Sequence, residues 1–156
     1  MATDDASRIT LREITADTVR EICRLETTED QRRFVAPNSV SIAQAYFEPK
    51  AWFRAVYADE RPVGFVMLLD DPEVPEYYLW RFMIAANEQR KGYGRRALEL
   101  VVEHVRSRPG ATELKSSCTP ASSGGPEPFY MGFGFRPTGV IHESEVELTL
   151  PLDREP

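Results

Sequence analysis

A short segment rich in glycine and basic residues carries the clearest chemical signal in the chain. Its residues are Gln89, Arg90, Lys91, Gly92, Tyr93, Gly94 and Arg95. The segment joins the apolar run 77–84 to a helical pattern that begins at Gly92. The first N–H groups of a helix lack partners within the helix and lie at the positive end of its dipole, so they bind anions. The two glycines let a phosphate approach the backbone closely, and the segment therefore predicts a phosphate site.

The spacing of these glycines differs from the two common nucleotide-binding fingerprints. The chain has no Gly-x-x-x-x-Gly-Lys-Ser/Thr loop, and the pair Gly92 and Gly94 lacks the further glycine of dinucleotide sites. A glycine at a helix start can also serve packing alone. If the segment binds phosphate, the spacing favours a phosphate-bearing cofactor other than a nicotinamide or ATP.

A second segment, 129–135, places a phenol among aromatic side chains. Its sequence is Phe-Tyr-Met-Gly-Phe-Gly-Phe, with the phenol at Tyr130. Aromatic clusters usually belong to a hydrophobic core, and Tyr130 taken alone fits that role. A phenol with a pKa of ~10 is protonated at neutral pH, however, and can donate a proton. Tyr130 is therefore either a core residue or a general acid.

Together the two segments resemble the GCN5-related N-acetyltransferase (GNAT) family. In that family a Gln/Arg-x-x-Gly-x-Gly/Ala turn after the fourth strand binds the pyrophosphate of acetyl-CoA, and a later Tyr-x-x-x-Gly-Phe segment often supplies the general acid. Both patterns occur here, at 89–94 and 130–135. The resemblance implies an α/β (α+β) fold in a single domain over residues 1–156, with a mixed central sheet of about six to seven strands and about four flanking helices.

The resemblance also implies the reaction and its residues. It implies an N-acetyltransferase with acetyl-CoA as co-substrate, in which a primary amine attacks the thioester directly and Tyr130 protonates the leaving thiolate. A backbone N–H near the end of the fourth strand polarises the acetyl carbonyl. The residues implied at the cofactor site are Phe82, Met83, Ile84, Gln89, Arg90, Lys91, Gly92, Tyr93, Gly94 and Arg95.

Within this family the chain is most similar to bacterial spermine/spermidine-type acetyltransferases. The similarity lies in segments 33–39, 80–84 and 124–130, and it implies a polyamine acceptor. Three features differ from such relatives: Ala85 stands where Asp is frequent, Trp80 where some polyamine enzymes carry an acid, and the loop 121–124 lacks the Asn that family members often place after the fifth strand. Aminoglycosides or peptide N-termini as acceptors, and a non-catalytic acyl-CoA-binding sensor, are the alternatives.

An amine acceptor must lose a proton before it can attack. With a lysine-like pKa of ~10.4, removing that proton at pH 7 costs about 4 to 5 kcal/mol. Glu76 is the first candidate for the general base, acting through a water, because it stands at the entrance of the apolar run 77–84. Glu73 and the carboxylates of the first helices are the alternatives.

The predicted elements position these segments. The nearly continuous apolar run 77–84 predicts a central strand covered on both faces, and an apolar stripe at helical spacing predicts a helix over 92–106. Runs 52–58 and 63–69, separated by 59–62, predict an antiparallel hairpin. Further predicted elements are a strand at 9–14, a helix at 19–25 capped from 15–17, a helix through residue 46 capped by Ser39, a strand at 112–118, a loop at 119–128, a helical turn at 129–133 and a last strand at 145–150.

Composition limits the function classes. The 156 residues, with 42% hydrophobic side chains, are typical of one globular domain. The net charge of −6 argues against general nucleic-acid binding and tolerates a cationic substrate. No signal peptide, membrane-spanning run, disulfide framework or metal-ligand spacing of Cys and His is present, so we expect a cytoplasmic protein without a metal. A homodimer is plausible by resemblance to the family and by the frequency of two-fold oligomers.

Overall fold

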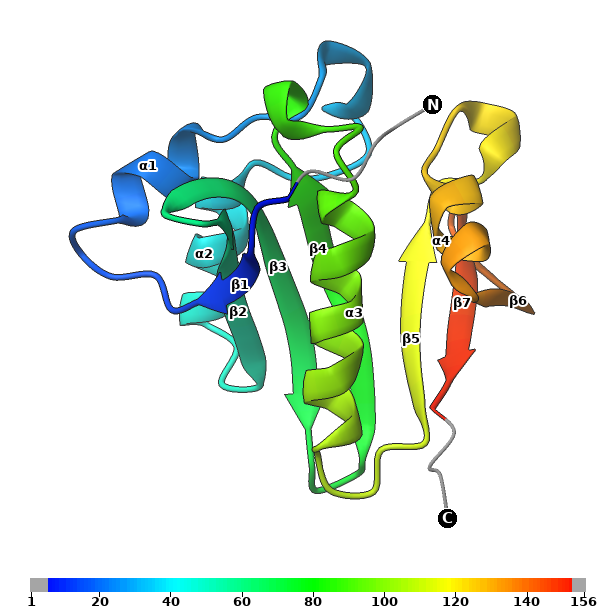
Figure 1. The fold of residues 1–156 in the computed structure, drawn as a ribbon. Helices are drawn as coiled ribbons and strands as arrows, with labels where there is room; N and C mark the ends of the chain where they lie inside the picture. The colour runs from blue at the N-terminus through cyan, green and yellow to red at the C-terminus, as the bar shows by residue number, and fades with distance from the viewer. Residues whose placement is uncertain (1–5, 153–156) are drawn as a thin grey trace.

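The computed structural model describes residues 6–152, which form one seven-stranded sheet with helices on both faces (Figure 1). The strand order is β1-β2-β3-β4-β5-β7-β6, and every neighbouring pair is antiparallel except β4 and β5. The predicted mixed sheet with four flanking helices is thereby confirmed. The elements are β1 (Ile9–Arg12), α1 (Val19–Arg24), α2 (Asn38–Tyr46), β2 (Ala51–Ala58), β3 (Arg61–Asp71), β4 (Glu76–Ile84), α3 (Tyr93–Arg106), β5 (Glu113–Cys118), α4 (Glu127–Phe133), β6 (Arg136–His142) and β7 (Glu145–Pro151), with 3-10 turns at Glu29–Gln31, Ala86–Glu88 and Ala121–Ser123.

The two faces of the sheet bury separate hydrophobic clusters. On β3, Val66 and Leu68 pack with α3, whereas Phe65 and Met67 pack with side chains of α1 and α2 on the opposite face. Figure 1 shows α3 running along the sheet in line with β4. The predicted apolar stripe of α3 is confirmed, because each of its five residues is buried: Ala97, Leu98, Val101, Val102 and Val105. None of the described helices is long and apolar enough to cross a membrane.

A bulge in β4 resets the direction of its side chains. Met67 pairs with Arg81 and Leu68 with Leu79, so Trp80 has no partner in β3. Leu79 and Phe82 consequently pack on the α3 face, while Trp80 packs toward α1 and α2. Without the bulge, strict alternation would place Trp80 and Phe82 on the same face.

The parallel pairing of β4 with β5 is short. It spans two register pairs, Tyr78 with Lys115 and Leu79 with Ser116. Residues 80–84 of β4 continue past this point without pairing to β5, which ends at Cys118. The predicted central strand is confirmed at the middle of the sheet, and its last five residues border an opening on the β5 side.

Several predicted boundaries differ from the structure. The first strand ends at Arg12, α1 has Thr18 as its N-cap without a side-chain cap bond, and β3 begins at Arg61 after the turn residue Asp59 (φ 53°). Helix α2 begins at Asn38, one residue before the predicted cap Ser39, because the Asn38 side chain is buried and donates to the carbonyl of Ile22 at 2.9 Å.

The predicted loop at 119–128 is more ordered than expected. It contains the 3-10 turn Ala121–Ser123, and α4 already begins at Glu127. Pro128 sits in the first turn of α4, where its missing N–H costs no helical hydrogen bond. Proline therefore marks a helix start here rather than the end of a loop.

We predict that Gly64→Ala destabilises the fold by about 1 to 3 kcal/mol, because an added methyl group must displace backbone. A Cβ at Gly64 would lie 2.5 Å from the Met83 carbonyl oxygen and 2.8 Å from Ile84 Cδ1. Gly132→Ala is the control, since a Cβ there meets nothing within 4 Å and alanine favours the helix. Urea unfolding of both variants measures the effect. Equal stabilities would show that β3 and β4 need no close approach at this point.

Candidate active site

A cavity of about 970 Å³ lies at the opening between β4 and β5. The sheet topology brings together segments from both halves of the chain to line it. These segments are 31–37, 78–84, 88–90, 92–95, 116–118, 124–126 and 129–130. Every residue predicted for the cofactor site except Lys91 lines the cavity. Tyr130, the predicted general acid, lines it as well. Glu76 does not.

The start of α3 opens into this cavity with unsatisfied donors. Gly92 is the N-cap in the left-handed conformation (φ 82°), and no side chain caps the helix. The first turn contains no acidic residue, although acids are favoured there. The backbone N–H groups of this turn and the nearby side chains of Arg90 and Arg95 therefore make this end of the cavity positive, which suits an anion.

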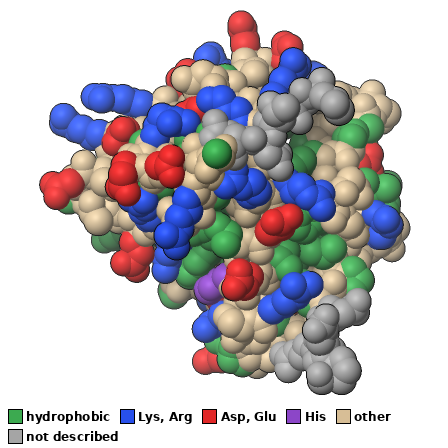
Figure 2. Space-filling model, viewed as in Figure 1, with side chains coloured by type: hydrophobic (Ala, Val, Ile, Leu, Met, Phe, Trp, Pro, Cys, Tyr) green, Lys and Arg blue, Asp and Glu red, His purple; other side chains and the backbone are tan. Residues whose placement is uncertain are grey.

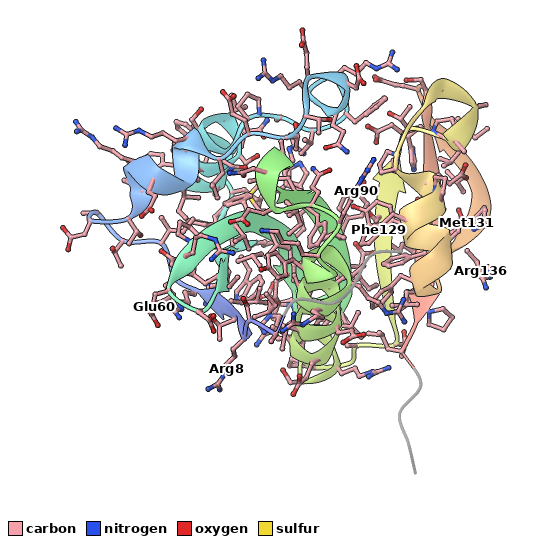
Figure 3. The ribbon with its side chains drawn as sticks, turned by 45° about the horizontal axis from the view of Figure 1, so that its top comes forward. Arg8, Glu60, Arg90, Phe129, Met131 and Arg136 are labelled. Atoms are coloured by element: carbon pink, nitrogen blue, oxygen red, sulfur yellow. The ribbon has the colours of Figure 1, made fainter. Side chains whose placement is uncertain are left out.

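Figure 3 shows the Arg90 side chain reaching from the turn before α3 into the space between the upper loops and α4. Phe129, also labelled there, lies close by on α4 and stacks on Phe82 of β4 at 6.1 Å between ring centroids. Arg90 has φ 63°, a left-handed conformation that is uncommon outside glycine. The turn thus holds an exposed arginine over the cavity by an unusual backbone conformation.

A buried carboxylate fixes the shape of this turn. Glu88 accepts hydrogen bonds from Arg61 of β3 and from Lys91 Nζ at 2.7 Å, and Arg61 also donates to the hydroxyl of Tyr93 at 3.3 Å. Burial raises the pKa of Glu88, but the bonds from Arg61 and Lys91 prevail and hold that pKa below its ordinary value. Lys91 is accordingly directed to Glu88, and it does not line the cavity.

Gln89 connects the turn to the opposite wall. Its amide exchanges two hydrogen bonds with Gln31, at 2.7 and 3.2 Å, and also donates to the Ile84 carbonyl at 2.9 Å. A second bridge closes the far side, where Arg33 donates to the Ser123 carbonyl at 3.2 Å. Segment 31–37 therefore forms a wall that is tied to both sides of the opening. Neither bridge is marked in the sequence, since each joins residues 58 or more positions apart.

Tyr130 is buried at the floor of the cavity. Its ring lies edge-on to Phe129 and Phe135, with centroids 5.4 and 5.5 Å away. Burial raises the pKa of Tyr130 well above that of a free phenol, so its hydroxyl stays protonated. The nearby thiol of Cys118 also stays neutral, because burial raises its pKa to about 11. The site therefore holds a proton donor and no ready thiolate nucleophile.

Glu76 lies outside the lining of this cavity. It is exposed at the first position of β4, about 26 Å along the strand from Ile84 at a rise of ~3.3 Å per residue. The sequence marked it as the entrance of the central strand, but the opening lies at the other end. Two carboxylates do line the cavity among the described residues, Glu88 and Glu145.

Glu145 is the cavity carboxylate that the sequence analysis missed. It begins β7 and lay in an ordinary alternation of polar and apolar residues, so nothing in the sequence distinguished it. β7 pairs antiparallel with β5, and this pairing carries its first residue to the open ends of β4 and β5. No group of three or more Cys, His, Asp or Glu side chains in the described residues is arranged to hold a metal ion.

The match to known families decides the class of the protein. The model of the acetyltransferase (GNAT) family matches residues 14–135. The chain belongs to the acetyltransferase (GNAT) family. Its enzyme class is therefore that of the N-acetyltransferases, as the two sequence segments predicted.

Solved GNAT structures share the fold of this chain at low sequence identity. The spermidine N-acetyltransferase of Vibrio cholerae, in complex with CoA and spermine, has a TM-score of 0.72 and 13% identity, covering 92% of this chain and 95% of its own. The ribosomal-protein-S18-alanine N-acetyltransferase of Escherichia coli has a TM-score of 0.69 and 16% identity, covering 96% of this chain and 97% of its own. The aminoglycoside 6'-acetyltransferase type Ii has a TM-score of 0.70 and 16% identity, covering 96% of this chain and 99% of its own. A comparison with curated protein sequences gives no match.

We predict that Glu88 makes the stability of this GNAT chain depend on pH. Its lowered pKa means that the ionised form stabilises the fold above about pH 4.5, and that this contribution disappears as the pH falls through the lower folded-state value. Glu88→Gln should lose about 2 kcal/mol at pH 7 and show a flatter decline between about pH 5 and 3. Urea unfolding across this range measures both effects.

The exposed pair of Glu26 with Arg32 supplies the control. Glu26→Gln should change stability by less than about 0.5 kcal/mol, because surface ion pairs contribute little. An equally small effect of Glu88→Gln would mean that the buried carboxylate does not stabilise the turn.

Proposed function

We propose that the protein transfers an acetyl group from acetyl-CoA to the primary amine of a small molecule by direct attack on the thioester. The observation that carries this proposal is the uncapped start of α3, which faces the same cavity as the buried phenol of Tyr130. One feature suits the phosphates of the cofactor and the other suits its leaving group. The alternative is a non-catalytic acyl-CoA-binding sensor, in which the start of α3 binds the cofactor phosphates and Tyr130 transfers no proton.

The residues at the turn fit the phosphate end of acetyl-CoA. The backbone N–H groups of Tyr93 and Gly94 would bind the pyrophosphate, with the charges of Arg90 and Arg95 close by. A Cβ at Gly94 would make only an ordinary contact with Phe129, at 3.5 Å, so packing does not require this glycine; we propose that it lets a phosphate approach the backbone. Lys91 would act indirectly, through Glu88 and the shape of the turn.

The open edge of β4 fits the arm that connects the phosphates to the thioester. Since β5 diverges after Leu79, the backbone of 80–84 on that side is free of strand pairing and can bond amide groups. When bound, acetyl-CoA supplies an electrophilic thioester carbonyl and a thiolate leaving group. A backbone N–H at Met83 or Ile84 is proposed to orient the carbonyl.

Tyr130 and Glu145 are proposed to handle the protons. The Tyr130 hydroxyl is held neutral by burial and can protonate a thiolate whose conjugate thiol has a pKa of ~8.5. Glu145 can accept the proton of the incoming ammonium, because Glu88, the other carboxylate of the cavity among the described residues, is occupied by Arg61 and Lys91. Its exposure also lets it pass that proton to water.

The class of acceptor is less directly supported. The resemblance to spermine/spermidine-type enzymes favours a polyamine, and the Vibrio cholerae structure contains spermine. The other two compared structures are named for ribosomal-protein alanine and aminoglycoside acetylation, on the same fold. We therefore propose a primary amine as the common requirement. The cytoplasmic location and the homodimer stay predictions from the sequence.

We predict that Tyr130→Phe lowers kcat by about 100-fold while leaving the acetyl-CoA dissociation constant within about two-fold, because it removes the proton donor but keeps the ring. Release of the CoA thiol measures turnover in a screen with polyamines, aminoglycosides, N-terminal peptides and amino acids, and calorimetry measures binding. Phe133→Leu on the same helix is the packing control. Unchanged turnover in Tyr130→Phe would reduce Tyr130 to a core residue. Cofactor binding without thiol release by the wild type with any amine would favour the sensor.

We predict that Arg90→Gln weakens acetyl-CoA binding about three- to ten-fold and that the difference shrinks at high salt, because the lost interaction is a charge on phosphate. Calorimetric titration at two salt concentrations measures the effect. Arg8→Gln is the control, since Figure 3 shows Arg8 at the other end of the molecule, far from Arg90. Equal affinities for both variants would contradict a phosphate contact by Arg90.

A further inference from the structure

The cavity contains more positive than negative side chains, although the chain as a whole carries a net charge of −6. Among residues 6–152, five arginines line it: Arg32, Arg33, Arg81, Arg90 and Arg95. The negative side chains of the lining in this part of the chain are Glu88 and Glu145. A site built for polyamines needs the reverse, because each amine of a polyamine is a cation at neutral pH.

Most of these charges are already accounted for. Glu88 is neutralised by Arg61 and Lys91, and Arg32 pairs with Glu26 at 3.1 Å. Arg90 and Arg95 lie at the phosphate end of the cavity, and Arg33 bridges to the Ser123 carbonyl. Arg81 and Glu145 are left. On the face shown in Figure 2, by contrast, acidic and basic side chains are interspersed without one dominant charge.

Arg81 is a half-buried cation whose donors the protein does not fully use. One terminal nitrogen donates to the Trp80 carbonyl at 3.1 Å and the other to Gln44 at 3.0 Å. Its Nε is buried without a hydrogen-bond partner, and no ion pair within residues 6–152 includes it. Burial lowers the pKa of Arg81, which the field of Glu145 partly offsets, yet an arginine stays charged at neutral pH. A buried guanidinium N–H without an acceptor is costly, and a ligand carboxylate that accepts from Arg81 would remove that cost.

The position of Arg81 in the sheet assigns it to the acceptor rather than to the phosphates. The bulge at Trp80 directs Arg81 to Gln44 of α2, on the face opposite α3. Phe82, the next residue, packs on the α3 face with Phe129. The proposed phosphate-binding turn leads into α3, so this turn lies at the α3 side of the cavity and Arg81 at the α2 side.

Glu145 complements Arg81 in the same part of the cavity. The two side chains are near enough for Glu145 to raise the pKa of Arg81, but they form no ion pair. Both line the cavity, and they extend from β4 and β7 on the two sides of the opening. A cation and an anion that face one cavity without neutralising each other suit a ligand that carries both charges.

We propose that the acetyl acceptor is an amine that also bears a carboxylate, an amino acid or a close relative, and that Arg81 binds this carboxylate while Glu145 faces the amine. This inference rests on the proposed acetyl transfer and narrows its substrate class. It makes Arg81 a specificity-determining residue and excludes polyamines as preferred acceptors. The carboxylate takes no part in the bond changes: the amine forms the new C–N bond, and the C–S bond breaks with its electron pair on the CoA sulfur, which Tyr130 protonates. Of the two protons that the ammonium loses, one passes to Glu145 and on to water, and the other restores the Tyr130 hydroxyl.

Matched pairs of acceptors test the proposal. Lysine is compared with cadaverine, ornithine with putrescine, and each remaining common amino acid with its amide, with spermidine included. We expect at least one acid to exceed its uncharged or decarboxylated partner about ten-fold or more in kcat/KM, the effect of one hydrogen-bonded charge. In Arg81→Gln this acid preference should disappear while kcat/KM for the partner stays within about two-fold, and Arg81→Lys should retain part of the preference.

Arg54→Gln is the matched control variant. Both arginines belong to the sheet, donate to the carbonyl of the preceding residue and lie over a tryptophan ring, Arg81 over Trp80 at 5.3 Å and Arg54 over Trp52 at 4.5 Å. Arg54 does not line the cavity, so Arg54→Gln should keep the acid preference. Acetyl-CoA affinity is measured in every variant. A loss of that affinity in Arg81→Gln, with the acid preference intact, would assign Arg81 to the cofactor and overturn the inference.

The outcomes separate this inference from the proposed function. Amines without a carboxylate that are acetylated as well as or better than their acids would overturn the inference and support acetyl transfer. If no amine is acetylated, acetyl transfer fails and the acceptor role with it, and calorimetry of the CoA-loaded protein with the same pairs then tests the other part of the inference, that Arg81 binds the carboxylate of an amino acid. Tighter binding of the acid in the wild type, lost in Arg81→Gln, supports it; equal binding of acid and partner overturns it.

Discussion

The short pairing of β4 with β5 is the constraint on which the rest of the site depends. Parallel hydrogen bonding stops after Leu79 and Ser116, and from there the two strands border an opening instead of a ladder. The backbone N–H and C=O groups along an unpaired strand edge must bond to other partners or stay accessible to water or a ligand. The opening therefore provides both a cavity of about 970 Å³ and backbone groups free to bind a ligand within it.

The bulge at Trp80 and the buried carboxylate of Glu88 determine what faces this opening. The bulge sends Phe82 to the α3 face and Arg81 to the α2 face, so one strand serves two different walls. Glu88 binds Arg61 and Lys91 and so anchors the turn that leads into α3 to the adjacent strand β3. The packing around the bulge and the ion pairs of Glu88 therefore hold unpaired polar groups of β4 and of the turn toward the cavity.

The two halves of the cavity have different electrostatic character. At the start of α3 an uncapped helix end and exposed arginines favour an anion, whereas the aromatic floor around Tyr130 keeps a phenol and a thiol neutral. Low solvation near Tyr130 strengthens any interaction with a developing charge. Direct transfer agrees with this environment, because Cys118 has its pKa raised to about 11 and is a poor nucleophile.

Local sequence determined the family, the central strand, the amphipathic helix α3 and the glycine turn before it, because each depends on residues close together in the chain. Gly92 and Gly94 allow backbone conformations and close approaches that other residues disfavour, and this property does not depend on the tertiary structure. Tertiary structure alone decided which acidic and basic side chains share the cavity. Glu76 and Glu145 look alike in sequence, but the direction of β4 removes the first and the pairing of β7 with β5 brings in the second. The role of Arg81 likewise depends on a bulge and on α2, which no local pattern reveals.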